Sequence, residues 1–160
     1  MSDPRPATAR GALAAHGTAG VPFRDLLAVE ELAIGEMRRV TVGELDLLLA
    51  HLEGGVVATD DRCPHMSAPL SLGRLEGCLV DCPLHAGRFD LCTGETVRMP
   101  TTGGLDAGGV YHAPWTPPGR EPKAEPPDLK ARARALTRTH RLRFYPVRVR
   151  GGRIEIAVPR

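Results

Sequence analysis

The segment Asp61–Asp90, DRCPHMSAPLSLGRLEGCLVDCPLHAGRFD, decides the fold because it contains two short motifs of the same kind. Cys63-Pro-His65 and Cys82-Pro-Leu-His85 each pair one thiol with one imidazole. The sixteen residues between the motifs are enough for one strand that leaves the first motif and another that leads to the second. Each motif would therefore lie at the tip of a tight loop, and both tips can face one site.

The order of the four candidate ligands distinguishes between kinds of metal centre. Tetrahedral zinc accepts two thiolates and two imidazoles, but structural zinc fingers place a cysteine pair before a histidine pair. A [2Fe-2S] centre can instead have one iron bound by two cysteines and the other by two histidines. We therefore expect Cys63 and Cys82 to bind one iron, and His65 and His85 the other. A structural or regulatory module that holds zinc is the alternative.

Composition favours a single all-β domain. Glycine and proline together exceed a fifth of the 160 residues, whereas aromatic residues make up 4%, which is typical of short strands joined by many turns. Runs of alternating or β-branched residues predict a meander of antiparallel strands, with hairpins at Gly54-Gly55 and Gly151-Gly152. The strands before the ligand motifs are expected at 26–29, 39–42, 45–52 and 56–59.

Two segments stand outside this pattern. Residues 1–20 are rich in small residues without a period and predict a mobile N-terminal arm, so that 21–160 form the domain. Residues 101–142 are rich in proline and predict an insertion that is partly helical. Within it, Asp128 can cap a helix with Leu129, Ala133, Leu136 and His140 along one face and basic residues along the other.

The cysteines and the terminal sequence indicate a compartment. No apolar run approaches the roughly 20 residues that span a bilayer, and no secretory signal begins the chain, so we expect no membrane contact and a cytoplasmic location. Cysteines in a reducing compartment are free or metal-bound more often than cross-linked. Cys78 and Cys92 have no histidine at ligand spacing, and we expect both to be free thiols that pack as small apolar side chains.

Charge is unevenly distributed along the chain. Nine acidic and two basic residues lie within 25–61, whereas 128–150 carries eight basic residues and one acidic residue. This predicts an acidic and a basic region, and the basic one could attract an acidic redox partner. Nucleic acid is not expected as a partner, because the basic helix lacks interleaved aromatic residues and any recognised binding motif.

The two ligand motifs, followed by Gly87-Arg-Phe89-Asp90 and Thr93-Gly94, resemble the Rieske family and in particular its soluble ferredoxins. The likeness covers roughly 23–100 and 143–159. It implies a small antiparallel β sandwich or barrel with one [2Fe-2S] cluster per chain at two hairpin loops, and a third loop at Pro100 that covers the cluster.

The resemblance also implies an activity. The chain would be an electron-transfer protein and not a stand-alone enzyme, taking single electrons from a flavin reductase and passing them to a terminal oxygenase through the edge of His65 or His85. A small redox subunit permanently docked in a larger reductase is the alternative.

Several positions depart from the family pattern. Rieske proteins of membrane complexes have a disulfide between the ligand loops, at positions held here by Ala68 and Leu84. Their serine and tyrosine hydroxyls beside the cluster correspond to Gly87 and Phe89, which donate no side-chain hydrogen bond. We therefore predict a reduction potential in the lower part of the Rieske range of about −150 to +300 mV. Ala86 stands where the family usually has glycine.

Overall fold

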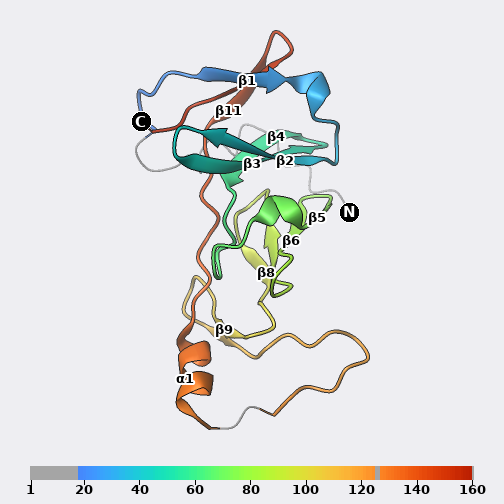
Figure 1. Ribbon diagram of the computed structural model, residues 1–160, viewed down its shortest axis with the longest axis vertical. Helices are drawn as coiled ribbons and strands as arrows, with labels where there is room; N and C mark the ends of the chain where they lie inside the picture. Colours follow the sequence, from blue (N-terminus) through green and yellow to red (C-terminus); the bar gives the residue numbers. More distant parts are fainter. Residues whose placement is uncertain (1–17, 125–126, 160) are drawn as a thin grey trace.

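The computed structural model describes residues 18–124 and 127–159, so the arm expected at 1–20 lies almost entirely outside the described residues. The described chain forms small antiparallel sheets, which confirms the expected all-β fold. Figure 1 shows three tiers: two sheets at one end, the ligand-bearing strands in the middle and the segment after Pro100 at the other end.

The first tier consists of two three-stranded sheets. One has the order β2-β3-β4 and the other the order β1-β12-β11. The bounds are β1 Arg24–Ala28, β2 Met37–Val42, β3 Leu45–Leu52, β4 Gly55–Asp60, β11 Val147–Arg150 and β12 Arg153–Ile156. The simple meander was wrong at its first strand, because β1 pairs with β12 from the far end of the chain and not with β2.

Both predicted hairpins are present, with one change in their turn residues. Gly151-Gly152 joins β11 to β12, and both glycines adopt positive φ, as a tight turn requires. In the other hairpin, Leu52 pairs with Gly55, so the turn is Glu53-Gly54 and Gly55 begins β4.

β3 is buried on both faces, and its residues alternate between two cores. Leu48, Ala50 and Leu52 pack into the core that also contains the cysteines of both ligand motifs. Leu47 and Leu49 pack on the opposite side against residues of β1 and β12. Because side chains alternate along a strand, one apolar run supplies both cores and joins the ligand-bearing tier to the first tier.

The middle tier is a four-stranded antiparallel sheet with the order β5-β6-β7-β8. Its strands are short: β5 Arg74–Glu76, β6 Leu79–Asp81, β7 Arg88–Asp90 and β8 Thr96–Arg98. The first ligand motif lies between β4 and a 3-10 helix, η3 (Leu70–Leu72), and the second joins β6 to β7. A second 3-10 helix, η2 (Val29–Glu31), follows β1.

The third tier lies within the predicted insertion and includes a small helix. Its elements are β9 Gly104–Leu105, β10 Tyr111–His112 and α1 Leu129–Leu136. The Ala131 N–H donates a 2.8 Å hydrogen bond to Asp128 Oδ1, which confirms Asp128 as the N-cap.

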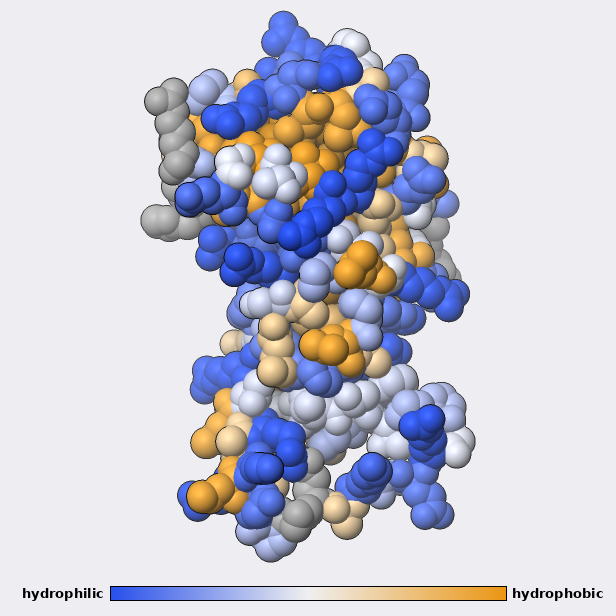
Figure 2. Space-filling model, viewed as in Figure 1, coloured by the Kyte–Doolittle hydropathy of each residue, from blue (hydrophilic) through white to orange (hydrophobic). Residues whose placement is uncertain are grey.

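The apolar face expected on this helix does not form a core. Leu129 is 78% exposed and Leu136 is 71% exposed, and His140 lies beyond the end of the helix. Figure 2 shows hydrophobic residues at the surface on the side of the third tier where Figure 1 places α1. The helix packs instead through its backbone, because the Thr137 and Arg134 carbonyls approach Gly104, where a Cβ atom would lie 2.3 Å from Thr137 O.

The acidic and basic segments partly neutralise each other. Arg143 of the basic segment lies 3.7 Å from Asp60, and Arg153, three residues beyond that segment, lies 2.5 Å from Asp25. Arg39 pairs with two further acids of the acidic segment. Within the described ranges, no helix is long and apolar enough to cross a membrane.

Candidate metal centre

The two ligand loops are closed by the same hydrogen bond. The Cys63 N–H donates to Ala68 O over 2.7 Å, and the Cys82 N–H donates to Gly87 O over 2.8 Å. In both loops the acceptor lies five residues after the cysteine. Although one loop follows β4 and the other joins β6 to β7, both hold their cysteine at the same place in the closed turn, with the histidine two residues later in the first loop and three residues later in the second.

Each loop also places the residue four positions after its cysteine in the left-handed region. Ser67 has a φ of 62° and Ala86 a φ of 56°. This conformation costs a side-chain-bearing residue roughly 1 kcal/mol, and glycine adopts it freely. The family's preference for glycine at the position of Ala86 thus has a local cause, and the closed loop here accommodates alanine.

The four candidate ligands form two pairs. Cys63 and Cys82 are 2% and 4% exposed, and each thiol shifts the pKa of the other. The rings of His65 and His85 are half-buried, with centroids 5.1 Å apart and planes at 86°. The thiols therefore lie in the core and the imidazoles nearer the surface.

Electrostatics favours the metal-binding protonation state at Cys82 and His65 and opposes it at Cys63, which a bound metal would have to deprotonate. The Cys63 thiol lowers the pKa of Cys82, and the Cys82 thiol together with burial raises that of Cys63. Burial, assisted by the charge of His85, lowers the pKa of His65 and favours the neutral ring. A neutral imidazole and a thiolate are the forms that bind metals.

The spread of the donor atoms suits a centre larger than one ion. The donor atoms of any three of these four residues extend over more than 4.8 Å. Tetrahedral zinc, with bonds of about 2.0 to 2.3 Å, draws its donors closer together than that. Two thiols on one side and two imidazoles on the other fit a two-iron centre.

A buried carboxylate fastens the first ligand loop to the chain that follows it. Asp61 is 2% exposed and accepts hydrogen bonds from Ser71 N over 2.8 Å and from Ser71 Oγ over 2.6 Å. Its second oxygen also lies 3.2 Å from the Arg39 guanidinium. The charge is thereby paired, and the segment on either side of the first motif is held in place.

Two arginines support the second ligand loop through one carboxylate. Arg88 donates from Nε and Nη2 to the two oxygens of Asp81, over 2.6 and 2.8 Å. Arg98 donates to Asp81 Oδ1 over 3.3 Å and to Ala86 O over 3.0 Å, and its guanidinium stacks 4.0 Å from the centroid of Trp115. Trp115, from the third tier, is thus connected to the loop that carries His85.

Replacing Asp81 by Asn is expected to destabilise the protein by about 2 kcal/mol at pH 7, because charged hydrogen bonds to Arg88 are lost. The Arg88 hydrogen bond is the main reason why the pKa of Asp81 lies below its usual 3.8. A lowered pKa stabilises the fold above the unfolded-state value, and that contribution disappears as the pH falls below about 4. Urea unfolding of both proteins between pH 3 and 7 should therefore show the difference shrinking at low pH. A constant difference across this range would contradict the assignment.

The segment after Pro100 contacts both candidate histidines. Pro100 is buried, and the Thr101 N–H donates to His85 O over 2.8 Å. Thr102 Oγ1 lies 3.0 Å from His65 Nε2, which leaves Nδ1 of that ring as its other donor atom. Sequence reasoning placed a third loop at Pro100 but did not identify Thr102, because nothing in the residue order indicates that it meets a histidine 37 positions earlier.

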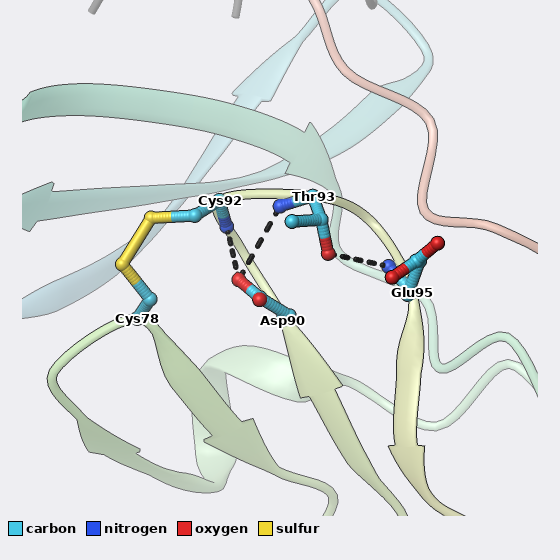
Figure 3. The surroundings of a disulfide bond; sticks show 5 residues. All are labelled: Cys78, Asp90, Cys92, Thr93 and Glu95. Carbon is cyan, nitrogen blue, oxygen red and sulfur yellow. Dashed lines mark hydrogen bonds between the residues drawn. A yellow bond between two sulfur atoms is a disulfide. The ribbon is translucent and has the colours of Figure 1, made fainter. Parts of the chain in front are cut away.

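The expectation for the other two cysteines was wrong in part. Both pack against the core as predicted, but they are joined to each other by a disulfide. Figure 3 shows this bond beside the turn after β7, where Asp90 Oδ1 accepts the N–H groups of Cys92 and Thr93 over 2.6 and 3.3 Å. The register of the hairpin was the missing signal: Leu79 pairs with Asp90, which brings Cys78 next to Cys92.

Comparison with known proteins identifies the family to which the chain belongs. The model of the Rieske [2Fe-2S] domain matches residues 23–109, which include both ligand motifs and the Pro100 segment. The chain belongs to the Rieske [2Fe-2S] family. Members of this family carry one [2Fe-2S] cluster per Rieske domain, and the donor set described above fits that group.

Relatives of this Rieske chain include components of oxygenase systems. It is 43% identical over 82 residues to the ferredoxin component of the naphthalene 1,2-dioxygenase system of Pseudomonas putida, covering 51% of this chain and 79% of the relative. It is 44% identical over 75 residues to the 3-phenylpropionate/cinnamic acid dioxygenase ferredoxin subunit of Photorhabdus laumondii, covering 46% and 70%.

Solved structures of two oxygenase systems share the fold of this chain. A chain in the complex of reduced oxygenase and oxidised ferredoxin of carbazole 1,9a-dioxygenase aligns with a TM-score of 0.55 at 25% identity, covering 84% of this chain and all of the other. Apo dicamba monooxygenase aligns with a TM-score of 0.55 at 26% identity, covering 85% of this chain and 33% of that chain.

Proposed function

We propose that Cys63, His65, Cys82 and His85 hold the [2Fe-2S] cluster, and that this chain carries single electrons from a flavin reductase to a terminal oxygenase in the cytoplasm. One observation carries the assignment: two equivalent loops sort their donors into a buried thiol pair and a more exposed imidazole pair. The relatives named as ferredoxin components of dioxygenase systems support the direction of transfer.

The cluster supplies a couple that gains and loses one electron, while the chain's own residues determine how a partner reaches it. Cys63 and Cys82 lie in the core, which keeps water from the sulfur side. His65 and His85 lie nearer the surface, so their rings are the shortest route outward. Electron transfer of this kind needs no general acid or base, and the chain is a carrier.

Metal analysis tests this proposal directly. The protein is purified anaerobically, and iron, acid-labile sulfide and zinc are quantified alongside electron paramagnetic resonance before and after dithionite. We expect two irons and two sulfides per chain, with a Rieske-type signal on reduction and a potential in the lower part of the range of about −150 to +300 mV. Zinc without a redox signal would overturn the assignment and favour a structural module.

Replacing Thr102 by Val is expected to raise the reduction potential. With Nδ1 of His65 on the metal, its Nε2–H donates to Thr102 Oγ1, and this bond makes the imidazole a stronger electron donor. Without this hydrogen bond the imidazole donates less electron density, the oxidised centre is less stabilised, and the potential rises. Thr101→Val is the matched control, because the Thr101 hydroxyl makes no hydrogen bond within residues 18–124 and 127–159. Potentiometric titration of both variants decides the matter, and equal potentials would show that the Thr102 contact has no electronic role.

A further inference from the structure

We propose that Cys78 and Cys92 form a second redox site, which exchanges electron pairs with dithiols and controls how firmly the second ligand loop retains the cluster. The inference rests on the cluster assignment proposed above. The bridge differs from that of membrane-complex Rieske proteins, which joins the two ligand loops at the positions of Ala68 and Leu84. Here, both cysteines flank one ligand loop and its two strands: Cys78 directly precedes β6, and Cys92 lies two residues after the end of β7.

The position of the disulfide connects it to the cluster. Cys78 and Cys92 are 14 residues apart, with Cα atoms at 5.8 Å, and the ring that they close contains two of the four proposed ligands, Cys82 and His85. The bond therefore closes the open end of the hairpin whose tip binds metal. No bond of this kind closes the base of the first ligand loop, which Asp61 fastens instead.

The backbone ladder of this hairpin is short, although its side chains are well held by the core and by Arg88 and Asp81. β6 and β7 have three residues each, paired from Leu79↔Asp90 to Asp81↔Arg88. Beyond them the Leu91 N–H donates to Cys78 O over 2.8 Å. The tip is held by the Arg88–Asp81 bonds, whereas a ladder this short frays most easily at its base, and the covalent link lies at that base.

A dithiol supplies both electrons and both protons that reduction of the disulfide requires. One thiolate of the dithiol attacks a sulfur of the bridge, the Cys78–Cys92 bond breaks, and a mixed disulfide forms with that cysteine. The second thiol of the reductant then displaces the cysteine and closes its own disulfide. Two electrons and two protons pass to the protein, which ends with two thiols. Both cysteines are half-buried and not fully enclosed, so a small dithiol can reach the bond.

Opening of the bridge affects the ligand at the tip. Cys82 is 4% exposed, and its burial depends on the hairpin remaining packed against the core. Once the two cysteines are thiols, the ends of the hairpin separate more often and a chelator reaches the cluster side of Cys82 more often. Whether Cys78 and Cys92 are a disulfide or two thiols thereby determines how long the protein retains its cluster.

Thiol counting tests the exchange itself. The holoprotein is incubated with or without dithiothreitol, denatured, labelled with a maleimide and analysed by mass spectrometry. Without reductant we expect two labels, on Cys63 and Cys82, and with reductant four. Four labels without reductant, or two labels with it, would overturn the proposal.

Cluster loss tests the coupling. Visible absorbance of the holoprotein is followed in excess bathophenanthroline, and we expect loss to be about tenfold faster after dithiothreitol and to slow again after oxidised glutathione. The Cys78→Ser/Cys92→Ser variant should lose its cluster at the fast rate with or without dithiothreitol, which controls for attack of the dithiol on the cluster. Equal rates for oxidised and reduced wild-type protein would overturn the coupling.

The two proposals fail in different ways. If the serine variant does not assemble a cluster, the reversible cycle on wild-type protein still decides the coupling. Absence of iron and sulfide from wild-type protein would refute the proposed function. In that case the labelling experiment would still show whether the bridge exchanges with dithiols.

Discussion

His85→Asn is expected to leave the purified protein with less than about a tenth of the wild-type iron and sulfide. Loss of a direct ligand should exceed the 10- to 100-fold loss of affinity typical of changes to groups behind the ligands. Asparagine has a similar polar character but supplies no ring nitrogen. The second loop contains no histidine other than His85, so no imidazole of that loop can take its place.

A matched histidine variant controls for general effects on assembly. His112 lies in β10, is exposed, and bonds through Nε2 to Asp106 Oδ2 over 2.9 Å. His112→Asn should retain two irons and two sulfides, with an unchanged paramagnetic signal. Iron content and spectra of the two variants are compared after identical anaerobic purification. A His85→Asn protein with full iron and an unaltered signal would show that this histidine is not a ligand.

Gly73→Ala is expected to destabilise the protein by more than about 3 kcal/mol. A Cβ atom at Gly73 would lie 1.9 Å from Asp81 O and 3.1 Å from Leu70 O, and both are backbone atoms that cannot rotate away. The backbone here is extended, with φ −84° and ψ −159°, so alanine would meet the neighbouring chain and not a conformational barrier. Relief requires η3 to move away from β6.

The clash at Gly73 should also change the iron content of the protein. η3 follows the first ligand loop and β6 leads into the second, so separating them moves one pair of proposed ligands relative to the other. We therefore expect lower iron content as well as a lower urea midpoint. Gly108→Ala is the control, because its nearest neighbour would be a side-chain oxygen, Asp106 Oδ1 at 3.3 Å, and not backbone, and its stability should change by less than about 0.5 kcal/mol. Similar midpoints for the two variants would contradict the predicted contact.

The candidate metal centre could be proposed from the sequence because its four candidate ligands lie close together along the chain. Two motifs of three and four residues contain all four proposed ligands, and the order of ligand types restricts the metals that fit. The all-β fold followed from glycine, proline and short apolar runs, and Leu47 to Leu52 of β3 form a strand buried on both faces. In each case a pattern within a few residues determined the structure.

Features that depend on contacts between distant residues were not predictable in this way. The pairing of β1 with β12, the disulfide and the contact of Thr102 with His65 all require the register or path of the backbone. The α1 helix shows the opposite case: its cap is local and was predicted, whereas Leu129 and Leu136 remain exposed because no element of the described chain packs over them.

The third tier makes the surroundings of the two ligand loops asymmetric. Thr102 sits on the ring of His65, whereas the neighbouring Thr101 contacts only the backbone of His85. The stacking of Arg98 on Trp115 holds this tier against the second loop from behind. An acceptor that contacts the Nε2 edge of His65 would therefore meet the Thr102 side chain as well as the ring. Partner choice would then depend on contour as well as on charge.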